Sequence, residues 1–489
     1  MKAKLDSFFG IAKAGSSFKV EIIAGIATFL AMAYILTLNP ALMEAGDKWA
    51  SVFIATAFGA VIGTLLMALL AKMPLAQAPG LGIATMVGSL VSGGVAGYFF
   101  PLSSALLLVF ISGLIFFLVS IIPCGKDKKT GKWISLREKI FEGVQRPIRT
   151  AIPVGIGLFI AFIGLQNSNI IVDGDSLVGL LDFSKASNWS QGGAACQAVV
   201  CIFSLIVIAI LSYFKFKGAV IIGILAGTAL ALPLGVTNFD IITGDGGVSW
   251  KFWENFKAYF DPDTGVFFTC FTDGFKHLKA DGLGVYFVTV ISFCMIDMFD
   301  TMGTAVGCTT SVGLVDEDGK PLNYGKILHS DSIATCVGAI AGTSSVTTFL
   351  ESSVGIAAGG RTGFASIITA LLFFVSIFIL PIFAFIPSAA ASSALIYVGV
   401  LMMKSVVDID FNDIKSAVPA FLAIIMMPLT YSITNGIGMA IISYVILTFA
   451  IYIFDFIKYK RGGEKPKLEI SIIMLVIFAL FILYFGSSK

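Results

Sequence analysis

Long apolar runs recur along the whole chain, and they constrain its fold more than any other feature. Most are close to the length of about 20 residues that an α-helix needs to cross a bilayer. We expect fourteen such spans, at residues 21–43, 51–71, 77–92, 102–122, 148–166, 192–213, 217–236, 283–312, 327–342, 344–359, 362–386, 389–404, 414–433 and 436–457. A further apolar stretch at 468–486 either spans the membrane or lies at its interface.

The composition agrees with this class. Charged residues make up only 13% of the 489-residue chain, whereas soluble proteins carry about 25%. We therefore expect an all-α polytopic membrane protein, in contact with the lipid bilayer and without a nucleic-acid partner. The seven cysteines show no paired metal-ligand spacing and the two histidines lie far apart, so neither a metal nor another cofactor is expected.

Basic residues in the loops predict the orientation of the chain. The loop after the fourth span has eight lysines and arginines, among them Arg137 and Arg146, against three acidic residues. By the positive-inside rule this loop is cytoplasmic, and the lysines of the first 19 residues agree. We expect a multi-pass protein of the plasma (inner) membrane with a cytoplasmic N-terminus and no cleavable signal peptide.

Two of the expected spans are short and interrupted. The third begins Pro74-Leu-Ala-Gln77-Ala-Pro79-Gly80, and the tenth holds Glu351 among glycines and hydroxyl residues. A carboxylate at membrane depth costs about 3 kcal/mol, so it is rarely present without a function. Each segment is third in a set of seven spans, and matched broken segments indicate an inverted-repeat transporter with a midplane site. Close helix packing is the alternative explanation for the glycines.

Six motifs carry a resemblance to a known family. They are Phe29 to Pro40, Ala78-Pro-Gly-Leu-Gly82, Gly155 to Asn167, Asp297-Met-Phe-Asp300-Thr301-Met-Gly-Thr304, the Glu351 segment through Gly359-Gly-Arg-Thr-Gly363, and Met427 to Gly436. Over almost its whole length the chain resembles the adenine–guanine–hypoxanthine permease branch of the nucleobase–cation symporters, relatives of uracil and xanthine permeases.

The resemblance implies about fourteen transmembrane helices in two inverted seven-helix repeats. A core domain would comprise residues 1–122 (spans 1–4) and 283–388 (spans 8–11). A gate domain would comprise residues 123–282 (spans 5–7) and 389–489 (spans 12–14 and the last apolar stretch). Spans three and ten would each contain a short strand followed by a half-helix, with substrate between them. Since relatives often dimerise, a homodimer is an expected alternative to a monomer.

The expected substrate contacts lie in these segments. Glu351 is the candidate that accepts two parallel hydrogen bonds from one edge of a purine base, because a carboxylate suits that arrangement. The other candidates are Asp300, Gln77, Ala84, Thr85, Phe349, Thr348 and Ser352. Packing is the alternative role for Phe349. The half-helix N-termini near Val354 and Thr85 are expected to present free backbone N–H groups.

Asp297 and Asp300 are the candidates for proton coupling, together with Glu351. Being three residues apart, the two aspartates lie near one face of a helix. Two carboxylates this close in a low dielectric do not both ionise easily, so one is expected to hold a proton. The resemblance favours Asp300 as the functional acid, and a local hydrogen-bonding role is the alternative for Asp297. The coupling cation is expected to be a proton rather than sodium.

These observations predict a secondary active transporter that imports a purine nucleobase of the guanine, hypoxanthine or adenine type by alternating access. An enzyme is not expected, because an intramembrane aspartyl protease needs catalytic aspartates on two different helices. The family typically has an asparagine where this chain has Ala84. Another planar heterocycle, such as a pyrimidine or a xanthine-like or urate-like compound, is therefore the alternative substrate.

Overall fold

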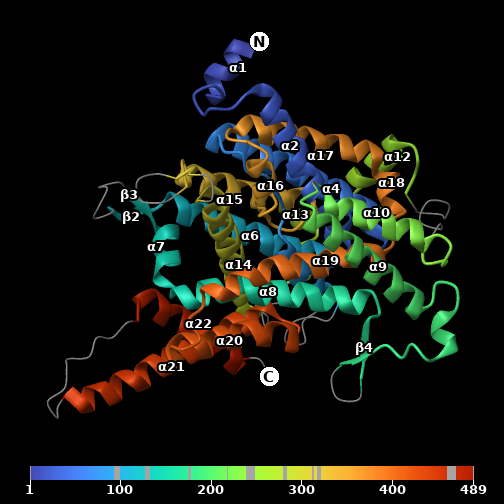
Figure 1. Cartoon of the computed structure of the whole chain (residues 1–489). Coiled ribbons are helices and arrows are strands. Elements are labelled where there is room, and N and C mark those ends of the chain that lie inside the picture. The colour runs from blue at the N-terminus through green and yellow to red at the C-terminus, as the bar shows by residue number, and fades with distance from the viewer. Residues whose placement is uncertain are drawn as a thin grey trace.

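Helices make up most of the chain (Figure 1). This computed structural model describes residues 2–92, 100–126, 133–174, 178–216, 218–237, 248–278, 283–310, 313–315, 321–459 and 470–487. In the first half the helices are α1 (Lys2–Phe9), α2 (Phe18–Met32), α3 (Ile35–Leu42), α4 (Trp49–Leu66), α5 (Leu81–Ser92), α6 (Leu102–Ile121), α7 (Leu136–Gly143), α8 (Arg146–Asn167), α9 (Ala194–Tyr213) and α10 (Ala219–Ala231).

The second half of the chain is also mainly helical. Its helices are α12 (Phe252–Phe260), α13 (Thr269–Thr272), α14 (Leu283–Thr310), α15 (Tyr324–Ala341), α16 (Ser352–Ala357), α17 (Gly363–Ser376), α18 (Leu380–Ala384), α19 (Ser388–Met402), α20 (Ile414–Leu429), α21 (Ile433–Tyr459) and α22 (Ile472–Ser487). Short antiparallel hairpins form outside the bundle, from β2 (Pro123–Lys126) with β3 (Trp133–Ser135) and from β4 (Ile171–Asp173) with β5 (Val178–Leu180). Figure 1 shows the two hairpins at opposite ends of the long helices.

Nine helical segments of the described residues are long and apolar enough to cross a membrane. They are 18–42, 46–71, 102–121, 146–167, 194–213, 283–309, 363–384, 388–408 and 433–459. Shorter apolar helices occupy 81–92, 219–231, 414–429 and 472–483, while α15 lies in the expected span 327–342. The prediction of a mainly helical, multi-pass membrane protein is confirmed. The apolar stretch at 468–486 contains α22, which packs against α21, α14 and α7.

The long helices pack in two groups. In one group, α15 contacts α4 and α6, and α17 contacts α2 and α4. In the other, α8 lies against α19 and α20, α20 against α21, and α9 against α10 and α19. Helices α5 and α14 contact α6 and so belong to the first group. Both also contact α8 of the second group. The two groups therefore meet along a seam that runs past α5.

A pair of three-residue strands lies inside the first group of helices. Strand β1 (Gln77–Pro79) precedes α5, and β6 (Val346–Thr348) precedes α16. They pair antiparallel, with Ala78 opposite Thr347, and every residue of both strands is buried. Because backbone groups inside a membrane protein need partners, two extended segments at this depth are stable only as a pair. The pairing brings together the two segments that the sequence marks as interrupted.

Small residues let the short helix α16 sit directly on α2. A Cβ atom at Gly355 would lie 2.0 Å from Oγ1 of Thr28 and 2.7 Å from the carbonyl oxygen of Ala24, so a side chain at this position does not fit. The backbone of α16 therefore approaches α2 more closely than any larger residue allows. This contact holds the N-terminal end of α16, where Glu351 lies, in a fixed position.

The start of α17 is capped by a residue far away in the sequence. Glu21 of α2 is fully buried, and its Oε1 accepts a hydrogen bond from the backbone N–H of Arg361 at 2.9 Å. Its Oε2 accepts from the N–H groups of Thr362 at 3.4 Å and Ala365 at 3.3 Å. A helix N-terminus has unpaired N–H groups and a partial positive charge, both of which favour a carboxylate. Glu21 thus joins α2 to the start of α17.

Replacing Glu21 with alanine is expected to destabilise the protein by about 2–3 kcal/mol, because buried N–H donors lose a charged acceptor. Thermal unfolding of the purified protein in detergent measures this, as a lowered melting temperature. The matched control is Asp408→Ala, which removes an exposed carboxylate from the end of the 3-10 helix Met403–Asp408 and should leave the melting temperature unchanged. Equal melting temperatures for the wild type and Glu21→Ala would contradict the capping role.

Candidate functional site

The two faces of the β1–β6 pair have different surroundings. Residues directly opposite each other in an antiparallel pair point to the same face, and successive residues alternate. Ala78 and Thr347 therefore point to one face, and Gln77 and Thr348 to the other. On the Thr347 face, a Cβ atom at Gly80 would lie 3.1–3.3 Å from side-chain atoms of Thr347 and Ser345. A side chain at residue 80 would crowd Thr347 and Ser345, so glycine keeps this buried side of the pair, called the open face below, free of one more side chain.

Glu351 lies three residues after β6, immediately before the first residue of α16. Its Oε1 accepts a hydrogen bond of 2.5 Å from the phenol of Tyr34, which lies between α2 and α3 and is itself buried. The carboxylate is thus held at the end of the strand pair by a residue from the first span. A partly buried carboxylate with a fixed direction can accept paired N–H donors from a planar ligand.

The expected free N–H groups near Val354 are not found, so that prediction is wrong. The N–H groups of Ser352, Ser353 and Val354 donate to the carbonyl oxygens of residues 349, 350 and 351, at 3.1, 2.9 and 2.9 Å. This tight turn pairs the donors at the start of α16 locally. Ligand recognition at this end of the site must therefore come from side chains.

The two aspartates of α14 face different partners. Asp300 is half-buried, and its Oδ2 accepts a hydrogen bond from Oγ1 of Thr347 at 3.2 Å. Asp300 is also close enough to Glu351 for their charges to interact. Asp297 is buried against α15, where its Oδ2 accepts from Oγ1 of Thr335 at 3.0 Å. The structure therefore brings Asp300, but not Asp297, to the open face of the strand pair.

Three of the candidate residues hold the strands in place. Nε2 of Gln77 lies 3.4 Å from Oγ1 of Thr348, and the N–H of Thr348 donates to Oγ1 of Thr301 at 3.3 Å. Oγ of Ser352 accepts from the N–H of Ala76 at 3.0 Å. Phe349, another residue that we expect to contact the substrate, is buried in the hydrophobic core. The hydrogen bonds of Gln77, Thr348 and Ser352 are thus made within the first group of helices.

The structure also reveals polar groups that the sequence reasoning did not single out. Oγ of Ser345 is buried and has no hydrogen-bond partner among the described residues. It lies beside Thr347 and Gly80 on the open face. Asn39 fixes the segment before β6, donating to Thr343 at 2.8 Å and accepting from Ser344 at 3.3 Å. The run of hydroxyl residues from Thr343 to Thr348 was the available signal for both contacts.

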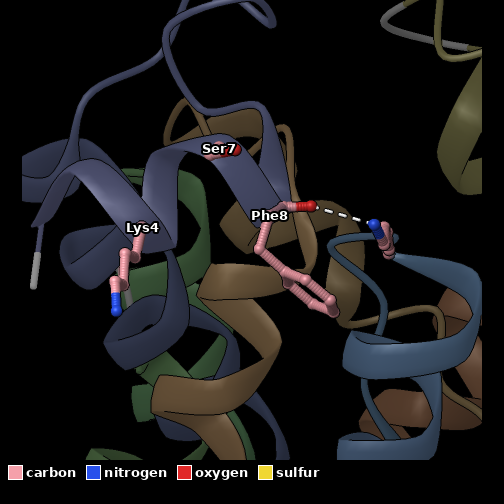
Figure 2. A pocket seen from close by; sticks show the side chains of 4 residues that line it. Lys4, Ser7 and Phe8 are labelled. Atoms are coloured by element: carbon pink, nitrogen blue, oxygen red, sulfur yellow. Dashed lines mark hydrogen bonds between the residues drawn. The ribbon is translucent and has the colours of Figure 1, made fainter.

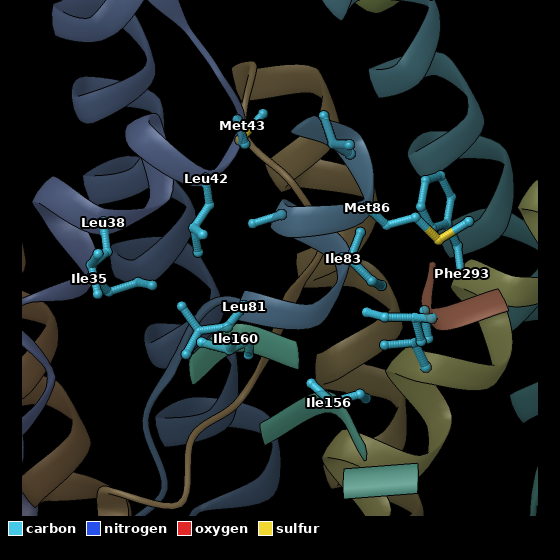
Figure 3. Close-up of a cluster of buried hydrophobic side chains, with 14 of the residues drawn as sticks. Ile35, Leu38, Leu42, Met43, Leu81, Ile83, Met86, Ile156, Ile160 and Phe293 are labelled. Carbon is cyan, nitrogen blue, oxygen red and sulfur yellow. The ribbon is translucent and has the colours of Figure 1, made fainter. Parts of the chain in front are cut away.

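Ala84 and Thr85 lie along the seam between the helix groups. Figure 3 shows Leu81, Ile83 and Met86 of α5 among apolar side chains of neighbouring helices, including Ile156 and Ile160 of α8 and Phe293 of α14. Ala84 is fully buried in the same cluster. These contacts are apolar, and a hydrogen bond of 3.8 Å from Oγ1 of Thr434 in α21 to Sδ of Met86 also joins the two groups here.

Thr85 lines a small cavity at one end of this seam. The cavity has a volume of about 210 Å³ and is lined by Ala41, Leu42, Glu44, Thr85, Ser89, Ile163, Asn167 and Tyr431. Tyr431 lies in the turn between α20 and α21. Residues of both helix groups contribute polar atoms to this space.

A larger hollow lies elsewhere and carries no comparable chemistry. It measures about 520 Å³ and is lined by Lys4, Ser7, Phe8 and Lys72. Figure 2 shows Nζ of Lys72 donating to the carbonyl oxygen of Phe8, at 2.9 Å. The hollow lies between α1 and the end of the fourth helix, away from the strand pair. It reflects how α1 rests on the bundle.

Comparison with known proteins assigns the chain to a family. A family model described as "Permease family" matches residues 139–439. The guanine/hypoxanthine permease PbuO of Bacillus subtilis is 36% identical over 482 residues, which is 97% of this chain and 100% of that protein. The adenine permease AdeP of Escherichia coli is 32% identical over 481 residues, or 98% of this chain and 95% of that protein.

Solved structures show a similar fold. The transmembrane domain of the cyanobacterial bicarbonate transporter BicA matches with a TM-score of 0.56 and 17% identity, over 86% of this chain and 97% of that one. The murine anion transporter Slc26a9 matches with a TM-score of 0.57 and 11% identity, over 92% and 72% of the two chains. With near full-length relatives that are guanine/hypoxanthine and adenine permeases, the chain belongs to the permease family that its motifs resemble, and it is a transport protein rather than an enzyme.

Proposed function

We propose that this protein imports a purine nucleobase by secondary active transport, coupled to a proton. The observation that carries the proposal is the carboxylate of Glu351, held by Tyr34 at the end of a buried strand pair that has the hydroxyls of Thr347 and Ser345 on its open face. A purine offers ring and exocyclic N–H donors on one edge, and a carboxylate accepts two such bonds strongly. The names of the relatives PbuO and AdeP support the purine class.

The base would bind on the open face of β1 and β6. Glu351 would accept its N–H donors, and the hydroxyls of Ser345 and Thr347 would serve its acceptors. Asp300 would carry the proton, because it contacts Thr347 on this face and interacts with Glu351. The contacts described above favour a supporting role for Gln77, Thr348 and Ser352, which we propose to hold the strands rather than to contact the base.

Alternating access would follow from movement of one helix group against the other. The group that contains the strand pair would be the core domain, and the group of α8, α9, α10 and α19 to α21 the gate domain, within fourteen spans arranged as two inverted repeats. The mainly apolar seam at α5 supports this division, because the hydrogen bond that crosses it, from Oγ1 of Thr434 to Sδ of Met86 at 3.8 Å, is a weak one (Figure 3). The cavity at Thr85 would be the outer end of the path.

The proposed setting is the plasma membrane, with the N-terminus in the cytoplasm. This orientation puts the basic segment around α7 inside the cell. A different planar heterocycle is the second candidate substrate, because Ala84 offers no hydrogen bond where the family has an asparagine. A homodimer is the proposed assembly, to be tested by the mass of the purified protein in detergent.

Uptake into proteoliposomes tests the proposal. Hypoxanthine, guanine, adenine, xanthine and uracil are each offered as labelled compounds, with an inward proton gradient, an inward sodium gradient, or neither. We expect hypoxanthine, guanine or adenine to accumulate with the proton gradient alone, and the same base to raise the melting temperature of the purified protein. If none of the five bases accumulates and none stabilises the protein, the proposal is refuted. Accumulation of xanthine or uracil alone would support the second candidate.

A further inference from the structure

Arg137 is buried deep in the protein, although its sequence position suggests a solvated loop residue. It belongs to α7, the short helix in the segment that joins α6 to α8, and its side chain is completely inaccessible to solvent. Its Nη2 donates to Oδ2 of Asp331 at 2.7 Å, and its Nη1 donates to the carbonyl oxygen of Leu328 at 2.9 Å and to Oγ of Ser332 at 3.2 Å. The guanidinium also lies 3.6 Å from the ring centroid of Phe116.

Stability alone gives little reason for such an ion pair. Removing two charges from water costs several kcal/mol per ion, and the attraction between them often only balances this cost. Apolar residues of similar volume commonly do as well or better. A buried arginine–aspartate pair that links a loop helix to α15 therefore suggests a use other than stabilisation.

The second oxygen of Asp331 leads from this pair to the strands. Asp331 Oδ1 accepts a hydrogen bond from the hydroxyl of Thr301 and lies 3.5 Å from Nε2 of Gln77. The Thr301 hydroxyl in turn accepts from the N–H of Thr348 at 3.3 Å. Gln77 and Thr348 are opposite each other in the β1–β6 pair. One carboxylate thus binds the arginine on one side and, on the other, both strands through two side chains.

The protonation state of Asp331 decides how well its carboxyl group accepts the hydrogen bonds of Thr301, Gln77 and Arg137. An ionised carboxylate has only acceptor sites, whereas a protonated one also carries an O–H donor. Thr301 and Gln77 present donors to Oδ1 and Arg137 presents one to Oδ2, so both oxygens act as acceptors, which suits the ionised form. The other charged groups near it, Asp297 and Asp300 of α14, are acidic and oppose that form. Arg137 is the cation that offsets them.

We propose that Arg137 is a positioning residue for the substrate site. Its guanidinium keeps Asp331 ionised and aimed at Thr301 and Gln77, and these residues hold β1 and β6 in the register that turns Thr347 and Ser345 toward the base. Helix α7 lies in the segment that connects the two helix groups. The hydrogen bonds through Asp331 therefore link the strand pair to that segment. The inference rests on the proposed function, since it concerns the site where the base would bind.

Binding of the preferred purine from the uptake panel to purified full-length variants tests the inference. Arg137→Met is expected to raise the Kd at least about tenfold, because small displacements of positioning groups have effects of this size or larger. Arg137→Lys keeps the charge and should stay within about threefold of the wild type. Arg146→Met is the matched control, since it removes an exposed arginine from the start of α8, and its Kd should not change.

A double variant separates positioning from stability. Arg137→Met with Asp331→Leu replaces the ion pair by apolar side chains and should restore the melting temperature lost in Arg137→Met. Its Kd should remain raised at least about tenfold. A wild-type Kd in either folded variant would overturn the inference while leaving the proposed function intact. If Arg137→Met does not fold, the double variant decides alone. Failure of the wild type to bind any base would reject the proposed function, and this inference with it.

Discussion

Glu351→Gln is expected to abolish measurable purine binding, with a loss of affinity of about 100-fold or more. Hydrogen bonds to a charged acceptor are worth about 1.5–3 kcal/mol each. In the variant the amide group of glutamine would place an N–H donor opposite an N–H donor of the base, where the wild type has an acceptor, so affinity is lost. The amide keeps an oxygen for Tyr34, so the local fold should survive. Thermal stabilisation by the base and equilibrium binding of labelled base measure the effect.

Two companion variants show whether the charge of Glu351 is the cause. Tyr34→Phe leaves the carboxylate but removes the 2.5 Å hydrogen bond that orients it, so a smaller loss of about tenfold is expected. Glu254→Gln changes an exposed glutamate of α12 and should bind the base like the wild type. Unchanged affinity in Glu351→Gln would remove this residue from the site.

The second large effect is expected from Asp300→Asn, which should uncouple transport. The asparagine can still accept the hydrogen bond from Thr347, so base binding should stay within about threefold of the wild type. It cannot take up and release a proton, so accumulation against a gradient should be lost. Counterflow exchange of labelled for unlabelled base needs no net proton movement and should persist.

Asp297→Asn is the natural comparison, because Asp297 lies one helical turn earlier on α14. Its carboxylate faces Thr335, and its Oδ1 has no hydrogen-bond partner among the described residues. If this variant loses accumulation while Asp300→Asn retains it, the proton is carried by Asp297 instead. Accumulation at the wild-type level in both variants would refute coupling through α14.

The helices could be predicted from the sequence because their signal is local. Apolar runs of the right length lie within one segment, and glycine and proline mark the interruptions before α5 and around α16. The direction of Gln77 could not be predicted in the same way. A shift of one residue in a strand reverses its faces, so the environment of Gln77 depends on its pairing with Thr348, 271 residues away.

The residues that sequence reasoning missed have distant partners. Tyr34 contacts Glu351 across 317 residues, and Glu21 caps a helix that starts more than 340 residues later. The sequence predicts Arg137 to be a cation of a cytoplasmic loop, because no residue near it in the chain indicates that its side chain is buried. Its partner Asp331 lies 194 residues further along the chain. Contacts of this kind form when the two halves of the chain pack together. They therefore leave no pattern in the amino-acid sequence of either half.

The pairing of β1 with β6 has a consequence for how the protein is made. Ribosomal synthesis delivers residues 77–79 to the membrane long before residues 346–348 exist. Until then, the backbone groups of β1 that later pair with β6 lack the partners that they need in lipid, while the N–H and C=O groups of Gln77 can already bond to the Thr64 hydroxyl of α4. The nascent chain must therefore wait in an environment that satisfies them, such as a hydrated insertion machinery. A polypeptide truncated after α15 would keep this segment unpaired, which makes it a target for membrane quality-control proteases.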